Sequence, residues 1–179
     1  MPQPQGTEPL RVLFLCTQNS ARSQIAEALL QARGDPRIVV GSAGTNPGPR
    51  VQPGAVQVLA HRGIDWSQAR PKSIDEIASE RWDLIITVCD NARESCPTLP
   101  GHPSTAHWGV PDPAAVTGDE ATVRRAYQNT AIVLGRRIDL LLALPFEQLE
   151  RLAFERKVRA IGETEAHPLR EVGSGSRSP

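Results

Sequence analysis

The chain contains three cysteines, Cys16, Cys89 and Cys96, and an odd number of thiols cannot close into a complete set of disulfides. Cys16 ends a short apolar run typical of a buried strand, and Arg22 follows six positions later, where a helix is expected to begin. In open α/β sheets, ligands bind at the carboxyl ends of the strands. A loop that enters a helix there directs backbone N–H groups toward one point, and the helix dipole adds positive potential. We therefore predict that a phosphate-like oxyanion binds beside the nucleophile Cys16, in a loop formed by Thr17, Gln18, Asn19, Ser20, Ala21 and Arg22.

Two side chains should assist the nucleophile in this loop. Arg22 carries a planar guanidinium, which binds a tetrahedral oxyanion through two parallel hydrogen bonds. The Ser23 hydroxyl can donate a hydrogen bond to the sulfur, and the N–H groups and the helix start should lower the pKa of the Cys16 thiol. The alternative is a buried structural cysteine followed by an unrelated arginine. The spacing alone is weak support, and it is the strand–loop–helix context that favours the functional interpretation.

The other two cysteines suggest redox chemistry, with alternatives that the residues alone leave open. Cys89 ends the third apolar run, so a parallel sheet would place it at the same edge as Cys16, and Cys96 follows in a polar segment. Cys89 can instead be a buried apolar residue, or both thiols can be passengers on a phosphatase. A zinc site with His102 and His107 is disfavoured, because the gap between the two cysteines exceeds the usual spacing of about two to four residues. The four histidines, at positions 61, 102, 107 and 167, form no recognisable set of ligands or bases.

Strands are expected to alternate with helices along the chain. Apolar runs predict strands at 11–16, 38–43, 82–89 and 105–108. Helical periodicity and capping residues predict helices from Ser23 to Gly34, at 53–63, after a capping box at Ser73 and Glu76, and at 119–144. This alternation predicts an α/β domain over 10–145 with a parallel sheet covered on both faces. We further expect a flexible N-terminus at 1–9, an additional C-terminal helix at 146–161 and a disordered polar tail at 162–179.

Composition argues against several classes of function. Twenty basic and twenty acidic residues cancel, so no strong field points to a nucleic acid or a membrane partner. No secretory signal is apparent, and the apolar runs are too short to cross a bilayer. We expect a cytoplasmic protein whose thiols stay reduced.

The residues from Cys16 to Ser23, CTQNSARS, resemble the Cys-x5-Arg-Ser loop of the low-molecular-weight protein tyrosine phosphatase superfamily, which includes the thioredoxin-coupled arsenate reductases. Gln18 departs from the glycine usual in the phosphatases. The resemblance implies a flavodoxin-like three-layer fold with a four-stranded parallel sheet. The segments 86–100 and 107–113, together with 42–45, are similar to the arsenate reductases in particular. Asp112-Pro113 is followed by two alanines, whereas the tyrosine phosphatases place aromatic residues there.

This resemblance implies a reaction in which arsenate is reduced to arsenite without a cofactor. Cys16 would attack arsenate, Asp112 would protonate the departing hydroxyl, and Cys89 and then Cys96 would take over the oxidised bond. A thioredoxin-like dithiol protein, a glutaredoxin or a small thiol would restore the thiols. Phosphate or sulfate would occupy the same loop. The segment 90–104 would have to move with the redox state.

Supporting residues also follow from the resemblance. Asn19 should orient the loop. Some members of the superfamily bind potassium near the positions of Asn19, Glu27 and Ser42, and Lys72 falls where those enzymes carry an acidic ligand. We therefore predict that no metal is required and that the Lys72 ammonium takes the place of potassium, the alternative being an exposed lysine. The runner-up functions are a phosphatase that uses Cys16, Arg22 and Asp112, and a non-enzymatic module that docks partners through the helix at 146–161.

Overall fold

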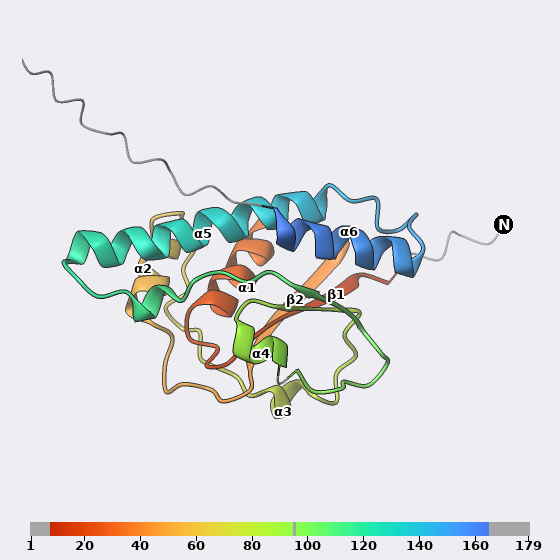
Figure 1. The fold of residues 1–179 in the computed structure, drawn as a ribbon, viewed down its shortest axis with the longest axis horizontal. Coiled ribbons are helices and arrows are strands. Elements are labelled where there is room, and N and C mark those ends of the chain that lie inside the picture. The colour runs from red at the N-terminus through yellow and green to blue at the C-terminus, as the bar shows by residue number, and fades with distance from the viewer. Residues whose placement is uncertain (1–7, 95, 165–179) are drawn as a thin grey trace, which may run out of the picture.

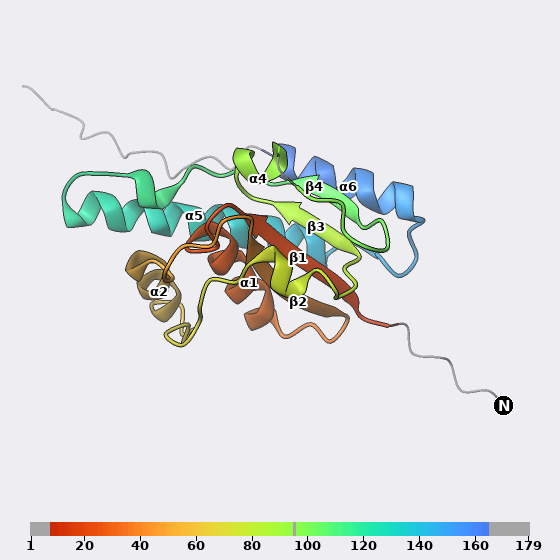
Figure 2. The same ribbon diagram turned by 90° about the horizontal axis from the view of Figure 1, so that it is seen from below.

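The computed structural model describes residues 8–94 and 96–164, and its centre is a four-stranded sheet. The strands are β1 (Leu10–Cys16), β2 (Ile38–Gly44), β3 (Leu84–Thr87) and β4 (Ser104–His107). All neighbours pair in parallel, in the order β2-β1-β3-β4 (Figures 1 and 2). This is the flavodoxin-like order, in which ligands bind where β1 and β3 lie side by side. The predicted parallel sheet and α/β class are confirmed.

Seven helical segments surround the sheet in the described part of the chain. They are α1 (Arg22–Arg33), α2 (Pro53–Ala60), α3 (Ile74–Ile77), α4 (Asp90–Glu94), the 3₁₀ turn η1 (Pro113–Ala115), α5 (Glu120–Leu142) and α6 (Arg151–Glu163). Helices α1 and α5 pack on one face, with α6 against β4, and the short α3 lies on the other face (Figures 1 and 2). Each parallel crossover therefore returns the chain to the same edge of the sheet, where the loops that follow β1, β3 and β4 gather.

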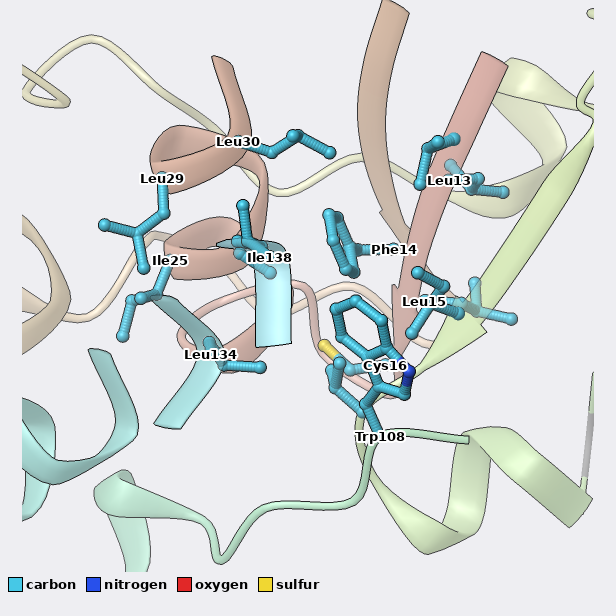
Figure 3. Packing of buried hydrophobic residues seen from close by; sticks show 14 of the residues in the cluster. Leu13, Phe14, Leu15, Cys16, Ile25, Leu29, Leu30, Trp108, Leu134 and Ile138 are labelled. Atoms are coloured by element: carbon cyan, nitrogen blue, oxygen red, sulfur yellow. The ribbon is translucent and has the colours of Figure 1, made fainter. Parts of the chain in front are cut away.

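The core explains why β1 reads as a continuous apolar run. All residues from Val12 to Cys16 are buried, because helices cover both faces of the strand. Phe14 packs against Trp108 with ring centroids 6.0 Å apart, and side chains of α1 and α5 close over this pair (Figure 3). Full burial of each large apolar side chain stabilises the fold by roughly 1.5–3 kcal/mol. Cys16, the predicted nucleophile, thus stands at the buried carboxyl end of β1.

Most predicted element ends agree with the structure, and the differences have local causes. Gly34 ends α1 in the left-handed conformation, and the capping box at Ser73 is present. Helix α1 begins at Arg22 with Ala21 at its N-cap, because the Ser23 hydroxyl is engaged by Cys16 instead of capping the helix. The segment Asp90–Glu94, for which no helix was predicted, forms α4.

The C-terminal helix is present but displaced from the predicted range. It runs from Arg151 to Glu163, whereas 146–161 was expected, so Gly162 belongs to the helix and not to a tail. Phe146 lies in the preceding turns and packs edge-on against Phe154 at 6.3 Å. The expected flexible residues 1–7 and the tail residues 165–179 lie outside the described residues. Within residues 8–94 and 96–164, no helix is long and apolar enough to cross a membrane.

Candidate active site

The loop between β1 and α1 turns its peptide N–H groups inward. Four of its carbonyls, those of Cys16, Thr17, Gln18 and Ser20, accept hydrogen bonds from the N–H groups of Thr45, Asn46, Gly48 and Gln52, at 2.8–3.1 Å. Because the C=O and N–H of one peptide point in opposite directions, the N–H groups of the following residues face the concave side of the loop. Gly44 allows this close approach, since a Cβ there would lie 2.6 Å from the Thr17 carbonyl oxygen. The arrangement is a cradle for an oxyanion.

Asn19 holds the loop in shape from within. It has a positive φ of 50°, and its backbone N–H donates to the Cys16 sulfur at 3.1 Å. Its side-chain oxygen accepts from the backbone N–H of Lys72 at 2.8 Å, which fixes the orientation of the amide. The amide nitrogen therefore faces two hydroxyls and donates to Ser23 at 2.8 Å and to Ser42 at 2.9 Å. Asn19 is fully buried.

The hydrogen bonds of the Asn19 amide continue to the Cys16 sulfur on one side and to Glu27 on the other. Since the Ser23 oxygen accepts from Asn19, its own hydrogen is free to point to the Cys16 sulfur, 2.8 Å away. On the other branch, the Ser42 hydroxyl donates to the Glu27 carboxylate, and the Lys72 ammonium lies 3.3 Å from the same carboxylate. The structure thus gathers the predicted supporting residues behind the loop in one network.

The pKa of the Cys16 thiol differs from the prediction. Burial raises this pKa and is the largest influence, while the hydrogen bonds from Ser23 and Asn19 lower it and the nearby Cys89 thiol raises it further. The expected net lowering is therefore wrong for this structure, because the thiol is only 4% exposed. The hydrogen bonds from the loop offset only part of the rise in pKa that burial causes.

Arg22 and Asp112 lie together at the mouth of the loop. The Arg22 guanidinium donates to the Val110 carbonyl at 3.1 Å, and its other terminal nitrogen lies 3.7 Å from the Asp112 carboxylate. Asp112 also accepts from the backbone N–H of Ala114 at 3.0 Å, which sets the turn at Pro113. The predicted arginine and the candidate acid are therefore adjacent, although 90 positions separate them in the sequence.

The structure brings two of the three cysteines together. Cys89 lies between β3 and α4, is buried, and its sulfur is 3.4 Å from the Thr17 hydroxyl of the loop. Cys96 is half-buried in a separate hollow of about 450 Å³ between α4, β4 and α6, next to Arg93 and Arg159. All three cysteines are free thiols. Among the described contacts, none joins the Cys96 sulfur to the loop.

Within the described residues, the histidines and the thiols are not grouped as a metal site. His107 bonds to the Thr87 hydroxyl at 2.8 Å and to the Asp90 carboxylate at 3.0 Å, while the His102 carbonyl accepts from Arg151. In residues 8–94 and 96–164, no three His, Cys, Asp or Glu side chains are grouped so that they could hold a metal ion. His167 lies outside the described residues.

Sequence reasoning missed several residues that support the site. Gln24, fully buried on α1, donates to the Asn19 side-chain oxygen at 3.0 Å and accepts from the Trp66 indole at 2.8 Å. Tyr127 of α5 is buried near Asp112, and both its burial and that carboxylate raise its pKa. Arg137 of α5 is buried beneath the segment that leads to Asp112. A polar residue on the apolar face of a predicted helix is the one signal that could have revealed them.

Comparison with known proteins places this architecture in a family. The family described as Low molecular weight phosphotyrosine protein phosphatase matches residues 11–151. An arsenate reductase of Bacillus licheniformis is 36% identical over 127 residues, which cover 71% of this chain and 91% of that protein. The crystal structure of an arsenate reductase from Archaeoglobus fulgidus superimposes with a TM-score of 0.57 at 34% identity, over 72% of this chain and 98% of that one. A thioredoxin-dependent arsenate reductase of Corynebacterium glutamicum gives a TM-score of 0.51 at 28% identity, over 75% of this chain and 63% of that one. The chain belongs to the low molecular weight phosphotyrosine protein phosphatase family.

Proposed function

We propose that this protein is an enzyme that reduces arsenate to arsenite through a relay of Cys16, Cys89 and Cys96. Its arsenate reductase relatives, at moderate identity over most of their length, support the reaction. The observation that carries the relay is the position of Cys89, whose sulfur contacts the oxyanion loop beside the nucleophile. A simple phosphatase has no use for a second thiol at that place.

In the first step, arsenate binds to the loop N–H groups in place of a phosphate or sulfate of the same shape. The Cys16 thiolate attacks arsenic, a sulfur–arsenic bond forms, and one hydroxyl departs as water. Asp112 supplies the proton for that departure, and Arg22, 3.7 Å from Asp112, stabilises the negative charge of the oxyanion. Arsenic remains in the +5 state.

In the second step, the Cys89 thiolate attacks the Cys16 sulfur. The sulfur–arsenic bond breaks, its electron pair stays with arsenic, and arsenite in the +3 state departs. A Cys16–Cys89 disulfide forms, so the two thiols are oxidised as arsenic is reduced.

In the third step, Cys96 attacks Cys89 and frees Cys16. Because Cys96 lies in its own hollow, the segment 90–104 must rearrange to bring the two Cα atoms within about 7 Å. A thioredoxin-like dithiol protein then reduces the Cys89–Cys96 disulfide and is itself oxidised. The thioredoxin-dependent neighbour supports this reductant. Since the cycle needs free thiols, we place the enzyme in the reducing cytoplasm.

Lys72 has a supporting role in this proposal. Its ammonium, 3.3 Å from Glu27, supplies the positive charge that potassium would otherwise bring to the network behind the loop. Hydrogen bonds through Ser42, Asn19 and Ser23 connect this ion pair to the Cys16 sulfur. The enzyme accordingly needs no potassium.

A Cys96→Ser variant tests the relay. Incubated with arsenate, it should release one arsenite per chain and then stop with Cys16 joined to Cys89, a linkage visible by peptide mass mapping. Cys16→Ser should release none, and the unaltered chain should turn over repeatedly with thioredoxin, thioredoxin reductase and NADPH. Repeated turnover by Cys96→Ser under the same conditions would refute the relay, and a chain that never turns over would favour a binding module.

Hydrolysis of aryl phosphates is the second candidate function. A hollow of about 420 Å³ lies beside the Asp-Pro turn, lined by Pro53, Pro113 and Tyr127 among others, and it could hold an aromatic ring. A Cys89→Ser, Cys96→Ser double variant separates the two functions. It should lose arsenate turnover while it keeps whatever hydrolysis of p-nitrophenyl phosphate the unaltered chain shows.

A further inference from the structure

A buried arginine outside the oxyanion loop joins the segment before Asp112 to the C-terminal helix. Arg137 of α5 is only 6% exposed. One terminal nitrogen of its guanidinium donates to the Gly109 carbonyl and the other to the Gly162 carbonyl of α6, each at 3.2 Å. One rigid, planar group therefore fixes the distance between these two backbone segments.

Arg22 and Arg137 bind consecutive carbonyls of the same segment. Arg137 holds Gly109, and Arg22 of the loop holds Val110 at 3.1 Å, while the Val110 N–H donates to Val88 at 3.3 Å. The segment is thus held from the helix side, from the loop side and from the sheet. This segment connects the end of β4 to Asp112.

The chain between these carbonyls and the candidate acid is stiff. Pro111 and Pro113 flank Asp112, and each proline fixes its own φ and restricts the residue before it. The backbone between Val110 and Asp112 has few dihedral angles that can adjust, so a displacement at Gly109 or Val110 also displaces the Asp112 carboxylate. The position of Asp112 relative to Arg22 depends on where Arg137 holds Gly109.

Helix α6 forms the other side of this support. The Trp108 indole, completely buried, donates to the Val158 carbonyl at 3.0 Å. Gly162 lies so close to the β4 end that a Cβ there would be 2.1 Å from the His107 carbonyl oxygen. Helix α6 thus packs directly on the residues that precede Gly109. The family match ends at residue 151, where α6 begins, so this support is an addition to the family domain.

Burial of the Arg137 guanidinium is not explained by the stability of the fold alone. Within residues 8–94 and 96–164, no carboxylate forms an ion pair with it, and its Nε has no hydrogen-bond partner. An apolar side chain of similar size would stabilise such a site at least as well, since desolvation of a charge is costly. Its use points to a requirement for defined geometry at the two carbonyls.

We propose that Arg137 is a positioning residue for Asp112, and that α6 serves as its anchor. By binding Gly109 and Gly162 together, Arg137 keeps the Asp-Pro turn at the distance from the oxyanion loop at which Asp112 can protonate the departing hydroxyl. The inference rests on the proposed function, in which Asp112 is the acid of the first step.

A double-mutant cycle tests this inference with the full chain. The rate of the first arsenite release and the inhibition constant of phosphate are measured for the unaltered chain, Arg137→Met, Asp112→Asn and the double variant. Asp112→Asn should slow the release by about 100-fold. Arg137→Met should slow it by about tenfold and change phosphate binding by less than about twofold, because the loop N–H groups are untouched. In the Asp112→Asn background, Arg137→Met should have no further effect on the rate.

Matched controls distinguish positioning from loss of stability. Arg136→Met changes the exposed neighbour on α5 and should leave the rate unaltered. If Arg137→Met does not fold, Arg137→Lys replaces it, since one ammonium cannot bind both carbonyls as the planar fork does. Equal slowing by the Arg137 variant in both backgrounds would show a structural role only and overturn the inference. The inference would also be overturned if the Arg137 variant released arsenite at the rate of the unaltered chain while Asp112→Asn released it slowly. A fast Asp112→Asn would refute the acid role together with the inference.

Discussion

Removal of the Ser23 hydroxyl should weaken the nucleophile in a measurable way. Asn19 donates to the Ser23 oxygen at 2.8 Å, which leaves the hydroxyl hydrogen free to point to the Cys16 sulfur, also 2.8 Å away; a thiolate at Cys16 carries no hydrogen and can only accept. Ser23 is fully buried, and no solvent can replace the lost donor easily. Ser23→Ala therefore removes the hydroxyl donor to the thiolate and leaves the backbone N–H groups of Asn19 and Ser23 in place.

The expected magnitude follows from the charge on the acceptor. A hydrogen bond to a charged group contributes roughly 1.5–3 kcal/mol. Because the neutral thiol accepts weakly, nearly all of this is lost from the thiolate form. Each 1.4 kcal/mol corresponds to a factor of about ten, so we expect at least tenfold less thiolate at any pH below the pKa.

Alkylation of a chain whose only cysteine is Cys16 measures this directly. In the Cys89→Ser, Cys96→Ser background, the rate of reaction with iodoacetamide should rise with pH, because burial raises the pKa of Cys16 and only the thiolate reacts. Ser23→Ala should move this rise to higher pH and slow the reaction about tenfold near neutrality. Ser104→Ala, which alters a buried serine at the start of β4, should leave the profile unchanged.

The plateau at high pH separates ionisation from access to the thiol. Both chains should reach the same limiting rate there, since the sulfur is fully ionised in each. A Ser23→Ala profile that coincides with that of the parent, or lies at lower pH, would refute the assignment of the hydroxyl as a donor to sulfur.

Two further predictions concern the surroundings of the site. Lys72→Gln removes the ammonium next to Glu27 and should lower the free energy of unfolding by about 1 kcal/mol; potassium chloride should then raise the melting temperature of the variant more than sodium chloride does. A parent chain that itself gains stability from potassium would contradict the proposed role of Lys72. Gly162→Ala should destabilise by about 2 kcal/mol, since its Cβ meets the His107 carbonyl. Gly135→Ala on α5, where the nearest atom is 3.6 Å away, should instead stabilise by about 0.5–1 kcal/mol in the same urea titrations.

The fold was predictable where one residue type determines the local structure. The apolar run from Val12 to Cys16 permits little besides a buried strand, and Gly34 takes the left-handed conformation that ends α1. Helix α4 could not be predicted, because its five residues, only one of which is apolar, are too few to show a helical period. The start of α6 was misplaced because the apolar pattern extends back to Phe146, which packs against Phe154 from a turn.

The site was predictable where its residues are close in sequence and obscure where they are not. The spacing from Cys16 to Ser23 predicts the loop, but nothing in it indicates that Arg22 binds Val110, 88 positions away. The direction of the Cys16 pKa could not be derived either. It depends on the balance between burial and hydrogen bonding, and burial is a property of the packed chain.

The donors around the Cys16 sulfur have a consequence for the order of the thiol exchanges. When Cys16 is bonded to Cys89, the Ser23 hydroxyl and the Asn19 N–H face a sulfur that carries no charge. An attack by Cys96 on the Cys89 side returns negative charge to that sulfur, where both donors are already aligned. Attack on the other side would expel Cys89 as a thiolate beside the Thr17 hydroxyl, 3.4 Å away, and would leave the donors at Cys16 without a charge to bind. The two donors offset part of the penalty that burial places on the Cys16 thiolate, so they favour release of Cys16 and reset the loop for the next arsenate.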